Sequence, residues 1–239
     1  MMTILAIEFW PSSHLGDIAA TFDKCGARTV YVRPEEGEPL PREPDDWDGL
    51  VMLGGPQNAE DDARYPYLGD AARLAAAFHE ASRPVLGVCL GSQILARAFG
   101  ARVRRQGWTE VGFTELEPTG AADSDPLLTG FGPVRILEYH EDTFDLPEKA
   151  TLLLTGERCR NQAFRLGASY GFQCHFECST ALWREWWPQM SDSLLETDPE
   201  FHARWPDDFA RHEAGAMAFC DAVSGRWLDL VRTNRRLAA

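Results

Sequence analysis

The chain has 239 residues, of which 44% are hydrophobic and 11% are aromatic. Its 37 acidic side chains outnumber the 23 basic ones, which gives a formal net charge of −14 at pH 7. Such an acidic surface argues against non-specific nucleic-acid binding, because that binding depends on cationic side chains that neutralise phosphates. A chain of this length can bury an α/β core without the support of disulfide bonds.

The six cysteines show neither paired C-x-x-C spacing nor the density of a disulfide framework. This usage indicates a reducing compartment and no metal site. The N-terminus has no basic leader, and no apolar run approaches the roughly 18 residues of a membrane helix. We therefore expect a cytoplasmic protein that needs no cofactor and has no nucleic-acid or membrane partner.

The first part of the chain alternates strand-like and helix-like segments. In order, we expect a strand at 3–8, a helix at 16–24, strands at 28–33 and 47–53, a helix at 67–81 and a strand that begins at Pro84. The Pro- and acid-rich segment 34–48 between them is expected to be a surface loop. This alternation predicts an α/β fold with a mostly parallel central sheet and helices on both faces.

Shorter β segments follow, and most lie too close together for intervening helices. They are expected at 101–105, 110–117, 134–139, 151–155, 162–166 and 170–176, with antiparallel pairing. Two helices, at 181–195 and 199–224, form a Trp-rich C-terminal part. We expect one domain with a core at about 3–190 and a helical extension at about 191–239. The tryptophans favour ordinary packing, although dimerisation or docking of a partner is an alternative.

Cys89 lies where an apolar strand meets a helix, between Gly87 and Gly91. This pattern is typical of a nucleophile elbow, in which a sharp turn lifts the nucleophile above the sheet. The exposed N–H groups and the dipole of the following helix favour the thiolate form of a cysteine at this position. The alternative is a buried cysteine that acts only as a small hydrophobic residue.

His175 is the best candidate for a base that would activate this thiol. It lies in a strand-like segment, where residues two apart point to the same face, so His175 and Glu177 are expected to project together. A carboxylate next to the imidazole would fix its tautomer and its orientation. Cys89, His175 and Glu177 therefore form a consistent set of nucleophile, base and orienting group.

Three segments of the chain resemble the signatures of the class I (triad) glutamine amidotransferases. They are Gly87-Val88-Cys89-Leu90-Gly91-Ser92-Gln93, Gly54-Gly55-Pro56 and Gly171-Phe172-Gln173-Cys174-His175-Phe176-Glu177. Their order and spacing also match, and the resemblance covers roughly residues 3–190. It implies a flavodoxin-like architecture.

The resemblance implies that Cys89 attacks the side-chain amide of glutamine, that ammonia leaves, and that water hydrolyses a γ-glutamyl thioester. His175 would act as general base and then acid, with Glu177 as its orienting group. The backbone N–H groups of Leu90 and Gly55 would form the oxyanion hole. Substrate-binding positions would be Gly54, Gly55 and Gln93.

Two further features qualify the resemblance. Phe176 stands where the family usually has a proline, which predicts a change in the local backbone or pocket shape. The segment from Ile136 to Pro147 resembles a stretch of the stand-alone, GMP-synthase-like members. That resemblance implies that His140 and Asp142 contact the substrate or shape its pocket, and stabilisation of a turn is the alternative.

The sequence leaves three functions open. The first is a glutaminase subunit that supplies ammonia to a separate synthetase, since no phosphate-binding loop of the G-x-x-x-x-G-K-[ST] type is present in this chain. The second is a free-standing hydrolase or peptidase that acts on γ-glutamyl compounds. The third, a catalytically idle binding or regulatory module, is disfavoured by the complete set of triad residues. A homodimer is compatible with each of them.

Overall fold

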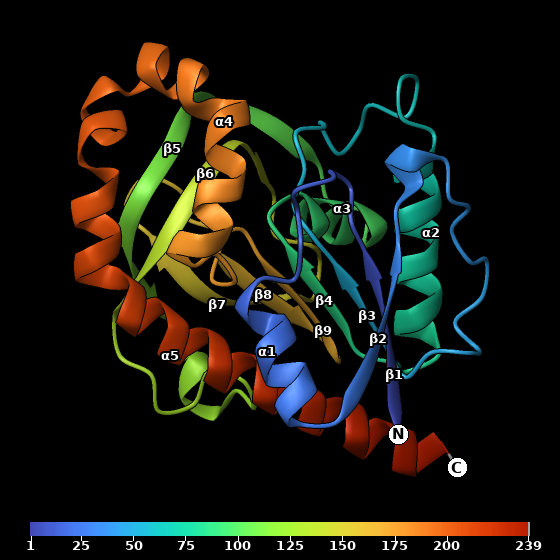
Figure 1. Ribbon diagram of the computed structural model, residues 1–239. Coiled ribbons are helices and arrows are strands. Elements are labelled where there is room, and N and C mark those ends of the chain that lie inside the picture. Colours follow the sequence, from blue (N-terminus) through green and yellow to red (C-terminus); the bar gives the residue numbers. More distant parts are fainter. Residues whose placement is uncertain (239) are drawn as a thin grey trace.

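The computed structural model describes residues 1–238 and contains one nine-stranded sheet with helices on both faces (Figure 1). The strands are β1 (Met2–Ile7), β2 (Ala27–Val32), β3 (Gly49–Met52), β4 (Val85–Val88), β5 (Val103–Pro118), β6 (Val134–Phe144), β7 (Thr151–Gly156), β8 (Ala163–Leu166) and β9 (Ser169–Phe172). The α-helices are α1 (Asp17–Lys24), α2 (Tyr67–Glu80), α3 (Leu90–Ala98), α4 (Thr180–Thr197) and α5 (Pro199–Ala238). None of the helices in this range combines the length and the apolarity that a membrane span requires.

The strand order is β2-β1-β3-β4-β9-β8-β7-β5-β6. The strands from β2 to β9 in this order pair in parallel, and those from β9 to β6 pair in an antiparallel manner. The expected parallel sheet with helices on both faces is confirmed, and the antiparallel strands continue it as part of the same sheet.

Side chains that alternate along β1 separate the two halves of the core. Ile4 and Ala6 point to the face that α1 and α5 cover, where Phe22 and Trp227 stack at 5.7 Å between ring centroids. Leu5 and Ile7 point to the opposite face, which α2 and α3 cover. The alternation follows from the period of two along a strand. Burial of both faces explains why β1, β3 and β4 are almost entirely apolar, whereas the edge strand β2 is only partly buried.

Helix α4 packs over the antiparallel end of the sheet, beside β5 and β6 (Figure 1). Trp183 is fully buried there, with the ring of Phe201 at 5.6 Å and that of Phe209 at 5.6 Å between centroids. The expectation that the C-terminal tryptophans serve packing is confirmed for Trp183. Helix α4 thereby lies next to the edge of the sheet at which the parallel strands end.

Several predicted boundaries were wrong, and strand β6 continues to Phe144 instead of ending at residue 139. Segments 101–105 and 110–117 form one strand, β5, whose register with β6 shifts between Arg105 and Glu110, so a β-bulge joins what the sequence pattern divides. The last strand ends at Phe172 instead of continuing to residue 176. Helix α5 continues well past Ser224, because its packing against the sheet face extends to Trp227 and Val231.

The carboxyl ends of β1, β3, β4 and β9 meet at one edge of the sheet. The chain leaves β1 toward β2 on one side and leaves β3 toward β4 on the other, so a topological switch point lies between β1 and β3. Ligands of open α/β sheets bind at this kind of crevice. The loops after these strands carry Trp10, Gly54, Cys89 and His175.

Candidate active site

Cys89 occupies the sharp turn between β4 and α3. Its φ of 50° and ψ of −111° lie outside the regions that side-chain-bearing residues normally adopt, and its N–H donates to Phe172 O at 2.8 Å. A Cβ at Gly87 would lie 2.5 Å from Gly91 O, and a Cβ at Gly91 would lie 2.0 Å from Met52 O. The predicted elbow is therefore confirmed, because both glycines permit a backbone approach that no other residue allows.

His175 and Glu177 form a buried pair beside this turn. The imidazole Nδ1 lies 2.7 Å from Glu177 Oε1, and the backbone N–H of His175 donates to Leu137 O at 2.8 Å. The expected reason for their contact was wrong, because β9 has ended before His175 and residues 176 and 177 form a turn. Turn geometry, rather than strand alternation, brings the carboxylate onto the imidazole.

The charge of His175 is set by opposing effects. Burial disfavours the imidazolium, but the carboxylate of Glu177, which bonds the ring, and the nearby sulfur of Cys89 raise the pKa of His175 well above its usual value. Since Glu177 occupies Nδ1, Nε2 remains for the cysteine and for a reacting group. The arrangement can hold a proton on His175 next to a sulfur nucleophile.

Phe176, which stands where the family usually has a proline, lies between His175 and Glu177 in the sequence, and its side chain is fully buried. Its ring lies 4.9 Å from that of Phe172 and 6.1 Å from that of Phe219 on α5, measured between centroids. The side chain therefore anchors the turn to the core. This contact gives the segment between His175 and Glu177 a rigidity that the usual proline would supply through its ring.

Two backbone N–H groups lie where the resemblance places an oxyanion hole. Leu90 is the first residue of α3, and Gly55 follows β3. Neither N–H donates to a protein acceptor within residues 1–238. A Cβ at Gly54 would lie 3.1 Å from His175 Cε1 and 3.6 Å from Cys89 Cβ, so the bare turn at Gly54 leaves room above the sulfur.

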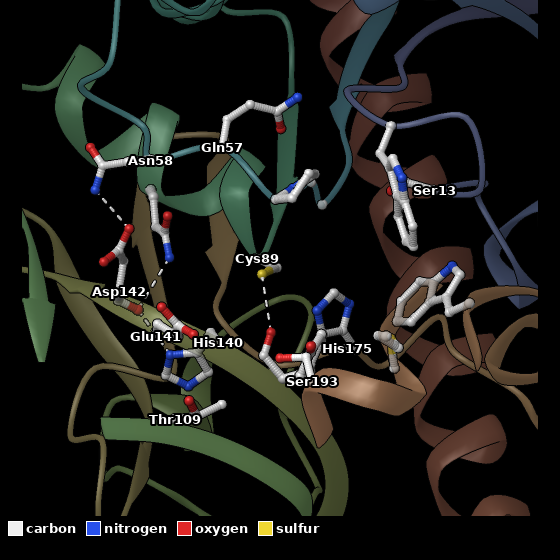
Figure 2. A pocket seen from close by; sticks show the side chains of 18 of the residues that line it. Ser13, Gln57, Asn58, Cys89, Thr109, His140, Glu141, Asp142, His175 and Ser193 are labelled. Carbon is white, nitrogen blue, oxygen red and sulfur yellow. Dashed lines mark hydrogen bonds between the residues drawn. The ribbon is translucent and has the colours of Figure 1, made fainter. Parts of the chain in front are cut away.

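A cavity of about 460 Å³ opens over Cys89. Figure 2 shows the sulfur near its centre, with Asn58, Asp142 and His140 on one side and with His175 and Ser13 on the other. The Cys89 Sγ lies 3.9 Å from Tyr139 O. Of the predicted binding residues, the structure brings Gly54, Gly55, Gln93 and His140 together as parts of the cavity wall.

Polar side chains hold strand β6 at Asp142 against the elbow. The Asn58 amide donates to Asp142 Oδ2 at 2.7 Å, and the Gln93 amide donates to Asp142 O at 3.2 Å. Gln93 also donates to Gln173 Oε1 at 3.1 Å, and Gln173 approaches Cys89 Sγ at 3.7 Å. Gln93 therefore connects helix α3, which follows Cys89, with Asp142 on β6 and with Gln173. Its contact with a substrate stays a prediction.

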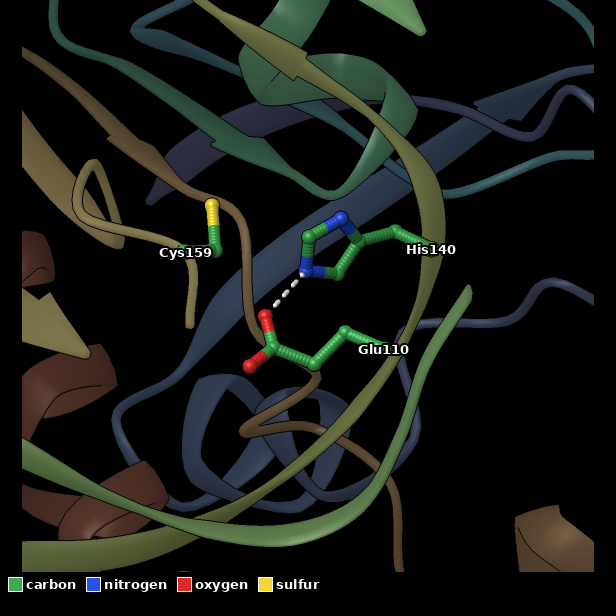
Figure 3. A group of neighbouring side chains, drawn as sticks. All are labelled: Glu110, His140 and Cys159. Carbon is green, nitrogen blue, oxygen red and sulfur yellow. Dashed lines mark hydrogen bonds and ion pairs between the residues drawn. The ribbon is translucent and has the colours of Figure 1, made fainter. Parts of the chain in front are cut away.

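His140 lies on β6, two residues before Asp142, and both of its ring nitrogens have partners in the protein. Nδ1 donates to Asp142 O at 2.8 Å, and Nε2 lies 3.3 Å from Glu138. Nε2 also faces Glu110 at 3.0 Å (Figure 3). Burial opposes a charge on His140, but the two carboxylates raise its pKa well above the usual value. His140 shapes the pocket through the Asp142 backbone, and its contact with a substrate stays a prediction.

Within residues 1–238, one group of side chains brings its donor atoms close enough to hold a metal ion. It consists of Glu110, His140 and Cys159, whose donor atoms all lie within 4.8 Å of one another (Figure 3). The imidazole Nε2 that such an ion would need already faces Glu110. An ion would thus have to replace the ion pair. Sequence analysis missed this cluster, although Glu110 stands opposite His140 in the register of β5 and β6.

The other side of the cavity is apolar, and sequence analysis also missed its role. Trp10 from the loop after β1 and Trp186 and Met190 from α4 line the cavity there. The ring of Trp186 lies 5.1 Å from that of His175, in an edge-to-face arrangement. No local sequence signal places Trp10 beside α4, because the two segments lie far apart in the chain.

Comparisons with known proteins agree with this geometry. The family described as glutamine amidotransferase class-I matches residues 12–185. The glutamine amidotransferase-like protein YfeJ of Salmonella typhimurium is 38% identical over 157 residues, which are 64% of this chain and 66% of that protein. Gamma-glutamyl peptidase 3 of Arabidopsis thaliana is 30% identical over 168 residues, which are 66% of this chain and 64% of that protein. The chain thus spans slightly less than two thirds of these relatives.

A solved structure extends the likeness to nearly the whole chain. The crystal structure of a glutamine amidotransferase from Thermotoga maritima superimposes with a TM-score of 0.86 and 28% sequence identity, and the match covers 96% of this chain and 98% of that one. The family match includes the elbow at Cys89 and the turn that carries His175 and Glu177. The chain belongs to the class I glutamine amidotransferase family.

Proposed function

We propose that this protein is a free-standing amidohydrolase that cleaves γ-glutamyl amides, with Cys89 as nucleophile, His175 as general acid and base, and Glu177 as the orienting group. The observation that carries the proposal is the strained position of Cys89 at the start of α3, in a cavity that it shares with His175, whose Nδ1 lies 2.7 Å from the carboxylate of Glu177. A non-glycine residue at φ 50° costs stability, and strained positions of this kind cluster at functional sites. The family membership and the likeness to a protein named as a γ-glutamyl peptidase support the same reaction class.

In the first half of the reaction, Cys89 Sγ attacks the γ-carbonyl carbon of the substrate. The carbonyl oxygen becomes an oxyanion that accepts hydrogen bonds from the N–H groups of Leu90 and Gly55, which have no protein acceptor within residues 1–238. As the tetrahedral intermediate collapses, the C–N bond breaks and His175 Nε2 gives its proton to the departing amine. The product that stays on the protein is a γ-glutamyl thioester.

In the second half, water replaces the amine next to His175. The imidazole takes a proton from the water as its oxygen attacks the thioester carbon, and the C–S bond then breaks. The sum is γ-glutamyl amide plus water to glutamate plus amine. Glu177, fixed at 2.7 Å from Nδ1, keeps Nε2 aimed at the reacting atoms in both halves.

The side of the cavity across Cys89 from His175 suits the α-amino and α-carboxylate groups of a γ-glutamyl substrate. Arg105, Glu141 and Asp142 line it, and Arg105 lies 3.6 Å from Glu141. Charges of both signs at one end complement a zwitterion. We place the α-carbon of the substrate there and the scissile bond above Cys89.

The decisive test is covalent labelling of the purified protein by a diazo-ketone analogue of glutamine, followed by intact-mass measurement. We expect one adduct on the wild type, none on Cys89→Ala, and one on Cys25→Ala, since Cys25 is an exposed cysteine outside the cavity. Hydrolysis of γ-glutamyl amides without a partner chain should disappear in Cys89→Ala alone. Equal labelling of wild type and Cys89→Ala would contradict the assignment of the nucleophile.

A glutaminase that depends on a synthetase partner predicts a different result in the same experiment. Such a protein would be labelled at Cys89 but would hydrolyse γ-glutamyl amides slowly on its own. Rapid turnover by the isolated chain therefore separates the free-standing hydrolase from the partner-dependent enzyme. An idle binding module would show neither labelling nor turnover.

A further inference from the structure

The cavity over Cys89 has two chemically different ends, and their difference defines the substrate further. We infer that the amine released by this protein is a neutral, apolar amine, best an aromatic one, so that the preferred substrates are γ-glutamyl amides of arylalkyl amines rather than glutamine or γ-glutamyl amino acids. This inference rests on the proposed function, because it assumes that Cys89 attacks a γ-glutamyl carbonyl.

The position of the general acid decides where the amine lies. The departing nitrogen must reach His175 Nε2, since Nδ1 is bonded to Glu177. His175 and Ser13 lie on one side of Cys89, and Asn58 and Asp142 lie on the other (Figure 2). The substituent on the nitrogen therefore extends past His175, away from Asn58 and Asp142.

The surface that this substituent meets contains three apolar side chains, with uncharged polar ones beside them. Trp186 lies edge-to-face against His175 at 5.1 Å, and Trp10 lies 6.2 Å from Trp186 between centroids. Met190 follows one turn later on the same face of α4. Indole faces and a thioether favour an aromatic ligand, because edge-to-face and sulfur–aromatic contacts add to the burial of apolar surface.

We call Trp10, Trp186 and Met190 the apolar wall. Hydrogen bonds join α4, which carries Trp186 and Met190, to the loop after β1, which carries Trp10. The Trp186 indole N–H donates to Ser12 O at 2.7 Å, and the Gln189 amide donates to Ser12 Oγ at 2.6 Å. Helix α4 and the loop are thus joined directly beside the cavity. An apolar ligand binds more tightly to a fixed apolar wall than to a mobile wall, because less side-chain freedom is lost on binding.

The charge around the cavity argues against amino acids and peptides as the leaving group. The lining side chains near Trp186 are Trp10, Ser13, Gln189, Met190 and Ser193, and none of them carries a charge. The cationic Arg105 belongs to the strand opposite Asp142, at the other end. The only cationic group that the carboxylate of a γ-glutamyl amino acid could meet among the described residues that line this end is His175, whose proton the departing amine needs. The carboxylate would therefore lose water next to the indoles without a partner of its own.

The size of the cavity also favours a leaving amine that is larger than ammonia. Its volume of about 460 Å³ falls in the range of ~300–1,000 Å³ that is usual for sites that enclose drug-sized ligands. Glutamine releases ammonia, which would leave the space beside Trp10 and Met190 filled only with water. An arylalkyl amine would fill this space.

The inference is tested by kcat/KM for four substrates with the wild-type protein: L-glutamine, γ-glutamyl ethanolamide, γ-glutamyl phenethylamide and γ-glutamyl phenylalanine. The last two differ only by a carboxylate. We expect phenethylamide to exceed each of the others at least tenfold, since a lost apolar contact of this size typically costs ~10–200-fold. An equal or higher value for any of the other three overturns the inference and leaves the proposed function in place.

Variants test whether the wall causes the preference. Trp186→Phe and Met190→Gln should each lower the ratio of kcat/KM for phenethylamide to that for ethanolamide at least fivefold. Trp187→Phe is the matched control, because Trp187 is the neighbouring indole outside the cavity and the ratio should stay at the wild-type value. An unchanged ratio in Met190→Gln overturns the inference even if Trp186→Phe fails to fold. Lack of turnover for all four substrates, with no labelling of Cys89, overturns the proposed function instead.

Discussion

Replacing the buried Glu138 by glutamine should make the stability of the protein less dependent on pH. Glu138 is fully buried on β6, and its Oε2 lies 3.3 Å from His140 Nε2, which already faces Glu110. Neither oxygen of Glu138 has a hydrogen-bond partner among the described residues. Burial raises the pKa of Glu138 from 4.5 to about 7, and the nearby imidazole of His140 only partly offsets the effect.

The sign and size of the effect follow from linkage. Between pH 4.5 and about 7 the unfolded chain releases the Glu138 proton while the native protein keeps it, so the free energy of unfolding falls as the pH rises. One pH unit corresponds to about 1.4 kcal/mol, and the whole interval therefore to about 3 kcal/mol. Glu138→Gln has no such proton. Relative to wild type, its free energy of unfolding should rise by about 2–3 kcal/mol between pH 5 and pH 8.

Urea unfolding at several pH values between 5 and 8 measures this difference directly. Glu117→Gln is the control, because Glu117 is an exposed carboxylate on the neighbouring strand β5 and should give a pH dependence parallel to that of wild type. If the curves of Glu138→Gln and wild type are also parallel, Glu138 is ionised in the native protein. The reasoning from burial would then be refuted.

Two further predictions concern the nucleophile and its base. Glu177→Gln should lower kcat/KM by ~10²–10⁴ and move the alkaline limb of the pH–rate profile to lower pH, because the charge that raises the pKa of His175 is lost; an unmoved limb would contradict this role. Gly91→Ala should reduce the free energy of unfolding by about 3 kcal/mol or more, because its Cβ would overlap Met52 O, whereas Gly120→Ala, which meets no atom within 4 Å, should unfold like wild type in urea.

Local chain properties made the elbow predictable. An apolar strand, two glycines and an amphipathic helix determine the turn around Cys89, and all of these lie within a short segment. The parallel part of the sheet also follows from local alternation, because a helix between two strands favours their parallel arrangement. Prediction was therefore accurate where neighbours in the sequence are also neighbours in space.

Contacts between distant segments were beyond the reach of the sequence pattern. The turn at His175 resembles a strand in its residue types, but it ends β9 because Phe176 turns into the core to meet Phe219 of α5. The approach of Glu110 to His140 depends on the register that follows the bulge in β5. Such positions depend on packing across the whole fold, which single-segment periodicity does not encode.

The side chains that form the apolar part of the cavity and the triad residues occupy different parts of the chain. The family match covers residues 12–185, so Trp10 lies just before it and Trp186 and Met190 just after it. Cys89, His175 and Glu177 all lie inside the matched region, while the side chains that we assign to amine selection lie outside it. Substitutions on one face of α4 would therefore alter the proposed choice of amine and leave the proposed triad untouched.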